Sequence, residues 1–284
     1  MSEASLSTVI DGITCFHPDK LHEYESYPEF GHELGEESQT LSFWDLSRFR
    51  ILIYELQILA SEFPSPRMLE IGCGNAAFLN SLQGKLKLDL TGSELHLRAL
   101  QEAKKKNPDL RLIQLDATDI PFQNEYEMIG AFDVLEHIVD DLAVLRGIYR
   151  GLIPGGYLIL TVPQHPFLWS SIDVMVCHQR RYTRATMLNA VQSAGFEIRY
   201  VSSFVFFLFP FMLLSRVFER GASAHTQSKD EFEKKIRFGP VLNTLLDYAM
   251  RIDEWMLRHR WSLPFGGTLM LVAQKPLNII SRYE

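Results

Sequence analysis

Short apolar runs and helical segments alternate through the middle of this chain, and this alternation constrains the fold more than any other feature of the sequence. Strand-like runs lie at residues 67–74, 86–94, 109–117, 126–137 and 157–163, and two more follow at 196–206 and 268–275. Segments with helical spacing separate the early runs, at 75–84, at 95–108 and again before residue 151. Such alternation predicts an α/β fold with a doubly wound, mostly parallel sheet and helices on both faces.

Two further segments flank this core. Ser42 and Asp45 have the spacing of a capping box, and apolar residues then recur at helical intervals as far as Leu59. Between the last two strand signals lie a phenylalanine-rich stretch, residues 204–214, and an amphipathic helix at 241–259. We therefore expect an N-terminal arm with a lid helix (1–62), a core (63–203), a capping insertion (204–262) and a final strand with a tail (263–284).

Charge and cysteine content argue against several functional classes. The chain has 28 basic and 35 acidic residues, a net charge of −7, whereas a general nucleic-acid binder usually has a basic surplus. Three cysteines, Cys15, Cys73 and Cys177, form neither a metal-ligand pattern nor a disulfide framework, which is typical of the reducing cytoplasm. We expect no spanning helix, because no apolar run reaches roughly 18 residues. Acids concentrate at 19–37, which predicts either a solvated arm or a mobile lid.

A glycine turn marks the first candidate site. Gly72 and Gly74 stand between a strand and a helix, where glycine lets the backbone approach a ligand closely. Glu94, at the end of the next strand, can accept hydrogen bonds from two ribose hydroxyls. These features suit either a dinucleotide or another nucleoside cofactor. Glu70 would repel a pyrophosphate and favours a cationic ligand, and Asp116 is placed to accept a hydrogen bond from an adenine amine.

The motifs LEIGCGNAAF, TGSE, QLDATDIPF, AFDVLEHI and LIPGGYLILTVP follow one another in this order. Together they resemble the Rossmann-like S-adenosylmethionine-dependent methyltransferases, over residues 66–163. SFWDLSRFR before the turn and LWSSIDVMVCHQRRYT after the fifth strand resemble a subgroup of that family. The resemblance implies a seven-stranded Rossmann-like methyltransferase sheet. One departure is Ala76, where the family usually has a third glycine; its methyl group is expected to tighten the pocket near the methionine end.

The resemblance also implies a set of S-adenosyl-L-methionine-binding residues. Glu70 supports the turn and reaches the amino group of the cofactor through a water, and Gly72 and Gly74 let the backbone pass. Glu94 holds the ribose. The remaining implied contacts, to the adenine and beside the methyl donor, fall on Asp116, Ala117, Phe132 and Asp133.

Candidate acceptor-side residues follow strands four and five. A hydroxyl acceptor needs a base, and the candidates are His137, His165, Asp173 and His178; of these, His178, His137 and Asp173 are our candidate catalytic residues. Arginines near His178 favour a neutral imidazole, which can accept a proton. The candidate substrate-binding residues are Trp169, Arg180, Arg181 and Tyr182, in which an arginine would clamp an anionic group of the acceptor.

Alternatives remain for several of these residues. Arg181 can instead pair with Asp173, and Tyr182 can begin a helix. Ubiquinone-type O-methyltransferases, which the DVLEH motif resembles, associate an acid-x-x-Glu-His set with a divalent metal; the matching residues are Asp133, Glu136 and His137. We do not include a metal in the expected site, and the other reading of Glu136 and His137 is that they orient the following helix.

The sequence thus predicts an S-adenosylmethionine-dependent methyltransferase that acts on a small molecule, on an oxygen of an apolar or aromatic compound. The alternatives are N-methylation, a non-catalytic cofactor-binding protein and an NAD-dependent oxidoreductase. The expected partner is a small, hydrophobic acceptor, without nucleic acid. The apolar stretch at 204–214 predicts a cover for such an acceptor or a peripheral membrane contact, and equally an ordinary core or homodimer interface.

Overall fold

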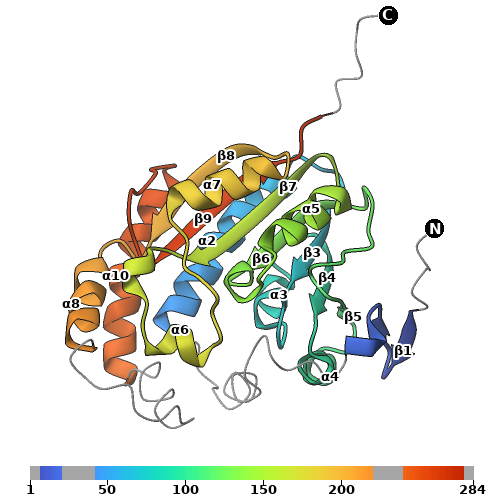
Figure 1. Cartoon of the computed structure of the whole chain (residues 1–284), viewed down its shortest axis with the longest axis horizontal. Helices are drawn as coiled ribbons and strands as arrows, with labels where there is room; N and C mark the ends of the chain where they lie inside the picture. Colours follow the sequence, from blue (N-terminus) through green and yellow to red (C-terminus); the bar gives the residue numbers. More distant parts are fainter. Residues whose placement is uncertain (1–6, 21–41, 220–238, 278–284) are drawn as a thin grey trace, which may run out of the picture.

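The computed structural model describes residues 7–20, 42–219 and 239–277, and its centre is a single twisted sheet (Figure 1). Nine strands follow the order β1-β2-β5-β4-β3-β6-β7-β9-β8. Their bounds are β1 Thr8–Ile10, β2 Ile13–Cys15, β3 Arg67–Ile71, β4 Asp89–Glu94, β5 Arg111–Gln114, β6 Tyr126–Phe132, β7 Leu152–Pro163, β8 Glu197–Phe204 and β9 Thr268–Gln274.

Helices cover both faces of this sheet, as the alternation predicts. They are α2 Phe43–Ala60, α3 Ala77–Leu82, α4 Leu97–Lys106, α5 Asp141–Gly151, α6 Ser171–Met175, α7 Arg184–Ser193, α8 Phe209–Glu219 and α10 Pro240–Arg258, with 3-10 turns η1 Pro18–Lys20, η2 Leu135–His137 and η3 Pro166–Leu168. One apolar cluster joins α2, α3, α4 and α10 to the sheet, and a second joins α5 and α7 to the opposite face. This arrangement confirms the doubly wound class.

The strand count differs from the seven strands expected. β1 and β2 form a short hairpin, and β2 pairs in parallel with β5, which lengthens the sheet at one edge. Residues 8–15 are therefore part of the sheet rather than of an arm. At the other side, the last strand β9 lies between β7 and β8 and is antiparallel to both.

Two local expectations were wrong. The fifth strand was expected to begin at residue 157, but β7 begins at Leu152 and includes the IPGG segment, and Leu152 pairs with Tyr126 ahead of a shift in register. The helix expected directly after DVLEH begins only at Asp141, capped by the Asp140 side chain, and the 3-10 turn η2 precedes it. The strand β6 therefore leads into a tight turn that holds Glu136 and His137 at the carboxyl end of the sheet.

The two flanking helices α2 and α8 begin at residues that suit a helix start. The capping box of Ser42 and Asp45 starts α2, as its spacing predicts. Pro210 is the second residue of α8, where proline costs no hydrogen bond, so it starts the helix instead of breaking one. Within the described ranges, no helix combines the length and the apolar composition needed to cross a bilayer. Most of the acidic segment 19–37 lies outside the described residues. The same holds for most of residues 219–235, whose charged composition favours a loop.

Candidate functional site

The glycine turn after β3 has the backbone conformation that its sequence demands. Gly72 and Gly74 both have positive φ, +68° and +52°. A Cβ atom on Gly72 would lie 2.5 Å from Cγ2 of Val134, so only glycine fits there, whereas a Cβ on Gly74 would meet nothing within 4 Å. The turn therefore packs against Val134 at Gly72 and leaves open space at Gly74, where the backbone can approach a ligand closely.

Ala76, the departure from the expected third glycine, has φ +58° and is fully buried in the apolar cluster. Its methyl group packs into the core. The expectation that this methyl group narrows the cofactor pocket is therefore wrong.

Glu70 is a buried carboxylate beneath this turn. Its Oε2 atom has no hydrogen-bond partner among the described residues. Burial raises the pKa of Glu70 to about 8, against an opposing attraction from Arg48, and the negative charge of Glu94 raises it further. A buried acid without a partner is costly unless a cationic group pairs with it. A cationic group of a ligand can therefore pair with Glu70 below the glycine turn.

Glu94 is held at the end of β4 by backbone donors. Its Oε1 accepts hydrogen bonds from the N–H groups of Leu95 (2.8 Å) and His96 (3.1 Å). Its Oε2 accepts one from the N–H of Gly74 at 3.1 Å. The acid expected to hold a ribose is therefore fixed directly beside the glycine turn.

Asp116 follows β5 and is already engaged. Its Oδ1 accepts hydrogen bonds from the backbone N–H (2.8 Å) and hydroxyl (2.7 Å) of Thr118, and its Oδ2 pairs with Lys20. Although burial opposes them, these partners lower the pKa of Asp116. His17 accepts a hydrogen bond from the backbone N–H of Asp116 at 3.1 Å. The N-terminal segment therefore closes this end of the site, and Lys20 shares the carboxylate expected to meet an adenine.

Two expected contacts at the end of β6 behave differently. Phe132 is 7% exposed and packs edge-to-face on Phe78, with ring centroids 5.1 Å apart. Asp133 has φ +58°, accepts a hydrogen bond from the Thr161 hydroxyl at 2.9 Å and forms an ion pair with Arg48. This ion pair connects helix α2 to the carboxyl end of the sheet.

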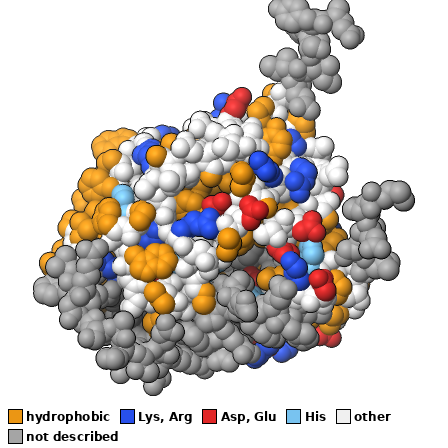
Figure 2. All heavy atoms as spheres, viewed as in Figure 1, with side chains coloured by type: hydrophobic (Ala, Val, Ile, Leu, Met, Phe, Trp, Pro, Cys, Tyr) orange, Lys and Arg blue, Asp and Glu red, His pale blue; other side chains and the backbone are white. Residues whose placement is uncertain are grey.

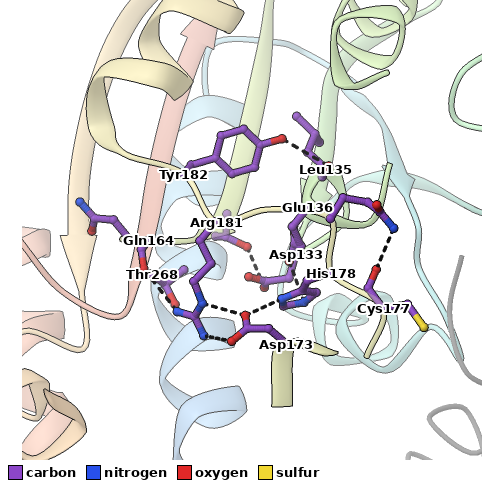
Figure 3. Close-up of polar contacts among 12 residues, drawn as sticks. Asp133, Leu135, Glu136, Gln164, Asp173, Cys177, His178, Arg181, Tyr182 and Thr268 are labelled. Carbon is purple, nitrogen blue, oxygen red and sulfur yellow. Dashed lines mark hydrogen bonds and ion pairs between the residues drawn. The ribbon is translucent and has the colours of Figure 1, made fainter. Parts of the chain in front are cut away.

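On the acceptor side, the chain brings three expected residues together (Figure 3). Arg181 and His178 both point at Asp173, which is fully buried. His178 Nδ1 lies 2.8 Å from Asp173 Oδ1. Arg181 donates two parallel hydrogen bonds to the same carboxylate, at 2.7 and 3.0 Å. Burial would raise the pKa of Asp173, but the hydrogen bonds from His178 and Arg181 outweigh it and hold that pKa well below its usual range. Asp173 therefore orients His178, and the expectation that it is itself a base is wrong.

The expected substrate-binding residues are mostly occupied inside the protein. The guanidinium of Arg181 is taken up by Asp173. Arg180 pairs with Asp141 at 3.0 Å and donates to the carbonyl of Val139. Tyr182 is buried, and its hydroxyl donates to Asp141 at 2.7 Å; burial and this carboxylate raise its pKa far above the usual range. Arg180 and Tyr182 fix the loop against α5 through Asp141, and Arg181 fixes it against α6 through Asp173. Partners within the protein, rather than an acceptor, thus engage these three side chains.

Two other expected residues keep exposed or apolar surroundings. Trp169 remains 38% exposed and stays a candidate contact. His165 has φ +66° and stacks near Phe167 and Phe209, with ring centroids 4.9 and 5.5 Å away. Burial and then the charge of Arg181 lower the pKa of His165.

A possible metal set differs from the one that the resemblance implied. Glu136, His137 and His178 offer ligand atoms that all lie within 4.8 Å of one another. Asp133 is instead paired with Arg48, so that member of the implied set is wrong. His137 and His178 meet edge-to-face with ring centroids 4.7 Å apart, and both oxygens of buried Glu136 lack a hydrogen-bond partner among the described residues. Burial, and then the charge of Asp133, raise the pKa of Glu136.

Sequence reasoning missed Arg48, Lys20 and His17 as parts of this site. Arg48 stands in the quoted SFWDLSRFR segment, so the motif was visible but its partner Asp133 was not. Lys20 and His17 lie shortly before residues 21–41, which the structure does not describe, and nothing in the sequence around them indicates a contact with Asp116. A shallow hollow lined by Leu88 and Arg111 lies at the amino ends of β4 and β5, the opposite edge of the sheet, and takes no part in this site.

Comparison with known proteins adds independent findings. The profile of the family described as "Methyltransferase domain" matches residues 45–201, more than half of the 284-residue chain. A demethylmenaquinone methyltransferase from Renibacterium salmoninarum is 24% identical over 167 residues, 58% of this chain and 65% of the relative. A fatty-acid O-methyltransferase from Mycolicibacterium smegmatis is 26% identical over 147 residues, 49% of this chain and 50% of the relative.

A ubiquinone biosynthesis O-methyltransferase from Bordetella avium is 25% identical over 126 residues, 41% of this chain and 52% of the relative. The chain thus spans between 50% and 65% of the length of these three curated relatives. Among solved structures, a Galdieria sulphuraria protein superposes with a TM-score of 0.55 at 15% identity, over 82% of this chain and 86% of the other. The cyclase SpnF superposes with a TM-score of 0.54 at 20% identity, over 86% of each chain. At these identities the likeness concerns the fold alone.

Proposed function

The chain belongs to the methyltransferase-domain family, and on this premise we propose that it is an S-adenosylmethionine-dependent methyltransferase that methylates an oxygen atom of an apolar small molecule. The observation that carries the proposal is the His178–Asp173 pair, 2.8 Å apart at the carboxyl end of the sheet. A base is what distinguishes transfer to a hydroxyl from transfer to a nucleophile that needs no deprotonation.

The residues around the glycine turn fit the cofactor. Glu70 offers a buried carboxyl group whose Oε2 has no hydrogen-bond partner among the described residues, which suits the cationic methionine end of S-adenosylmethionine. The open space above Gly74 admits the ligand, and Glu94, fixed beside it, can accept hydrogen bonds from ribose hydroxyls. Asp116 and Ala117 would meet the adenine, with Lys20 sharing the Asp116 carboxylate. Bound there, the cofactor supplies an electrophilic methyl group, whose C–S bond breaks as the acceptor oxygen bonds to carbon.

His178 has the right tautomer to act as the base. Because Asp173 is ionised and accepts from Nδ1, the proton of a neutral imidazole lies on Nδ1 and the lone pair on Nε2. Nε2 can then take the proton of an acceptor hydroxyl. Glu136 Oε1 lies 3.8 Å from Nε2, beyond hydrogen-bond distance, so Glu136 leaves this lone pair available. Alignment of the acceptor, rather than the base, is expected to contribute the larger share of the acceleration.

The surroundings of His165 support an apolar acceptor. A row of rings runs from His165 through Phe209 to Phe265, with successive centroids 5.5 and 5.2 Å apart. Two of the relatives are named as O-methyltransferases, one acting on fatty acids and one in ubiquinone biosynthesis. We extend that chemistry to this chain as part of the proposal, with the described residues 204–219 and 239–262 covering the acceptor.

An acceptor screen tests the atom that is methylated. The full chain is incubated with methyl-labelled S-adenosylmethionine and three acceptor sets: catechols with alkyl chains, fatty carboxylic acids, and amines of matched chain length. Labelled products are then treated with mild alkali, which cleaves methyl esters but leaves aryl ethers and N-methyl groups. Labelled ethers or esters are expected. Product formed only from the amines would overturn O-methylation and establish the N-methyltransferase alternative.

A second experiment tests His178 against its neighbour. His178→Gln is expected to lower kcat by roughly 10²-fold or more while the Kd for S-adenosylmethionine is unchanged, because the proposal places this residue at the acceptor and not at the cofactor. The matched control is His137→Gln, the ring that lies edge-to-face with His178. If both variants lose activity and a chelator abolishes wild-type turnover, His178 is a metal ligand and its role as a base is refuted. If His178→Gln turns over normally, the base lies elsewhere.

A further inference from the structure

Helix α10 buries its acids and part of its apolar residues against the protein, and it leaves a second set of apolar residues exposed to solvent. Asp253 is fully buried and accepts hydrogen bonds from the backbone N–H groups of Phe206 (2.6 Å) and Phe207 (3.3 Å). Glu254 is also buried and accepts two hydrogen bonds from Arg50 of α2, both at 2.9 Å. These acids therefore hold α10 against α2 and the chain after β8, together with the core residues Met250 and Leu257. The helix has more apolar residues than its inward face buries.

The outward face of α10 is an apolar stripe. It comprises Val241, Leu245, Tyr248, Ile252 and Trp255, which recur every three or four residues along one side of the helix. Leu245 is 62% exposed and Trp255 is 53% exposed. Trp261 follows the helix, is 51% exposed and stands with its ring 5.6 Å from that of Trp255. We call these six residues the α10 stripe. An exposed apolar face of this extent marks a contact surface.

The charges beside the α10 stripe have one sign. Arg251, Arg258 and Arg260 are exposed on the helix and the turn that follows it. The acids of α10 are buried or half-buried, and Glu55 of α2, the partner of Arg260, is buried as well. Figure 2 shows hydrophobic side chains gathered along the edge of the molecule where α8 and α10 lie, with basic side chains among them.

We propose that the α10 stripe and its arginines bind a lipid surface with anionic headgroups. Tryptophan and tyrosine beside leucine, isoleucine and arginine are the composition of helices that lie in the membrane interface, with apolar side chains inserted and cations at the headgroups. The arginines attract anionic lipid, and no exposed acid of α10 opposes that attraction. α10 lies on the surface, as its buried acids require, and does not cross the bilayer.

A second copy of the chain fits this surface less well. In a twofold contact between two antiparallel α10 helices, the arginine edge of one copy would face the arginine edge of the other. Such a contact places like charges together, while Asp247 and Glu55 pair with Arg251 and Arg260 within each copy, and this disfavours it. The buried side of α10 lies near the proposed acceptor site, because Asp253 binds the chain at Phe206, and Phe206 stacks on Phe265 with centroids 4.7 Å apart.

Vesicle sedimentation of the full chain, without cofactor or acceptor, tests the inference separately from the proposed function. Vesicles of phosphatidylcholine with phosphatidylglycerol are expected to bind the protein, and vesicles of phosphatidylcholine alone to bind it far more weakly. Leu245→Ser with Trp255→Ser should abolish binding. Arg251→Gln with Arg258→Gln should weaken it about 25-fold, at roughly fivefold for each arginine near the surface.

Matched controls come from exposed residues elsewhere. Val9→Ser with Val139→Ser removes two valines that are 68% and 76% exposed, and Arg199→Gln removes a half-exposed arginine on β8. Both controls should bind vesicles as the wild type does. Acyl chains labelled with bromine should quench Trp255 and Trp261 in the wild type, which reports insertion without any variant. Binding that is indifferent to anionic lipid, or a wild-type dimer that Leu245→Ser with Trp255→Ser converts to monomer without any vesicle binding, would overturn the proposal.

Discussion

Replacing Glu70 with glutamine should make the protein more stable at high pH while weakening its hold on the cofactor. The pKa of Glu70 is raised by burial from 4.5 to about 8. The folded protein therefore binds this proton more tightly than the unfolded chain does. Its contribution to stability is complete below about pH 4.5 and is lost as the pH rises through the folded pKa.

The size of the effect follows from the shift. Within the window between the two pKa values, each pH unit lowers the free energy of unfolding by about 1.4 kcal/mol. From about pH 5.5 to pH 8.5 the loss attributable to Glu70 is about 3 kcal/mol. Glutamine does not titrate, so the difference in unfolding free energy between Glu70→Gln and the wild type should grow by that amount over the same interval. Other groups with raised pKa values, such as Glu136, cancel in the difference.

Urea unfolding of both proteins at the two pH values measures this difference, and calorimetry with S-adenosylmethionine measures the cost to binding. Wild-type affinity should rise toward pH 8, because the cation needs the ionised acid, and Glu70→Gln should bind weakly at every pH. Glu127→Gln serves as a control: although burial opposes it, hydrogen bonds from Arg67 lower the pKa of Glu127, so both states are ionised throughout the window. A stability difference for Glu70→Gln that stays constant with pH would refute the reasoning.

Three further substitutions test the fold and the turn. Gly72→Val should abolish S-adenosylmethionine binding in calorimetry and destabilise the protein by about 2 kcal/mol or more, because a side chain there combines φ +68° with a clash against Val134; unchanged binding would remove the turn from the site. Ser42→Ala should cost about 1 kcal/mol in urea unfolding through loss of the capping box with Asp45. Phe204→Ala should cost about 3–5 kcal/mol, since this ring is fully buried, and a loss below 1 kcal/mol would contradict its place in the core.

The central strands could be predicted because their signals are local. A buried parallel strand reads as a continuous apolar run, and the glycines after β3 mark a turn by themselves. The candidate site followed from the same pattern, since the carboxyl ends of parallel strands meet at one edge and bring Glu94, Asp116 and Asp133 together. The profile of the methyltransferase-domain family later confirmed the family that the motifs resemble.

The missed features depend on contacts between distant residues. β1 and β2 have three residues each, too few for periodicity to distinguish a strand from a loop. Nothing near Arg48 in the sequence reveals that it faces Asp133, 85 residues away. In α10 the spacing predicted an amphipathic helix, but the structure divides its apolar residues between the core and solvent. Arg50 pairs with Asp247 and Glu254, which turns the acidic side of the helix toward α2.

The position of β9 has a consequence for how the chain is made. β9 lies between β7 and β8. During synthesis β7 and β8 therefore lack this neighbouring strand until β9 leaves the ribosome, more than sixty residues after β8. In that interval each presents an unpaired edge, beside the newly emerged phenylalanines that follow β8. Nascent chains stalled before residue 268 should therefore recruit chaperones, and chains released after residue 274 should not. Among the described strands, the one made last is therefore the one that joins the edge strand β8 to the rest of the sheet.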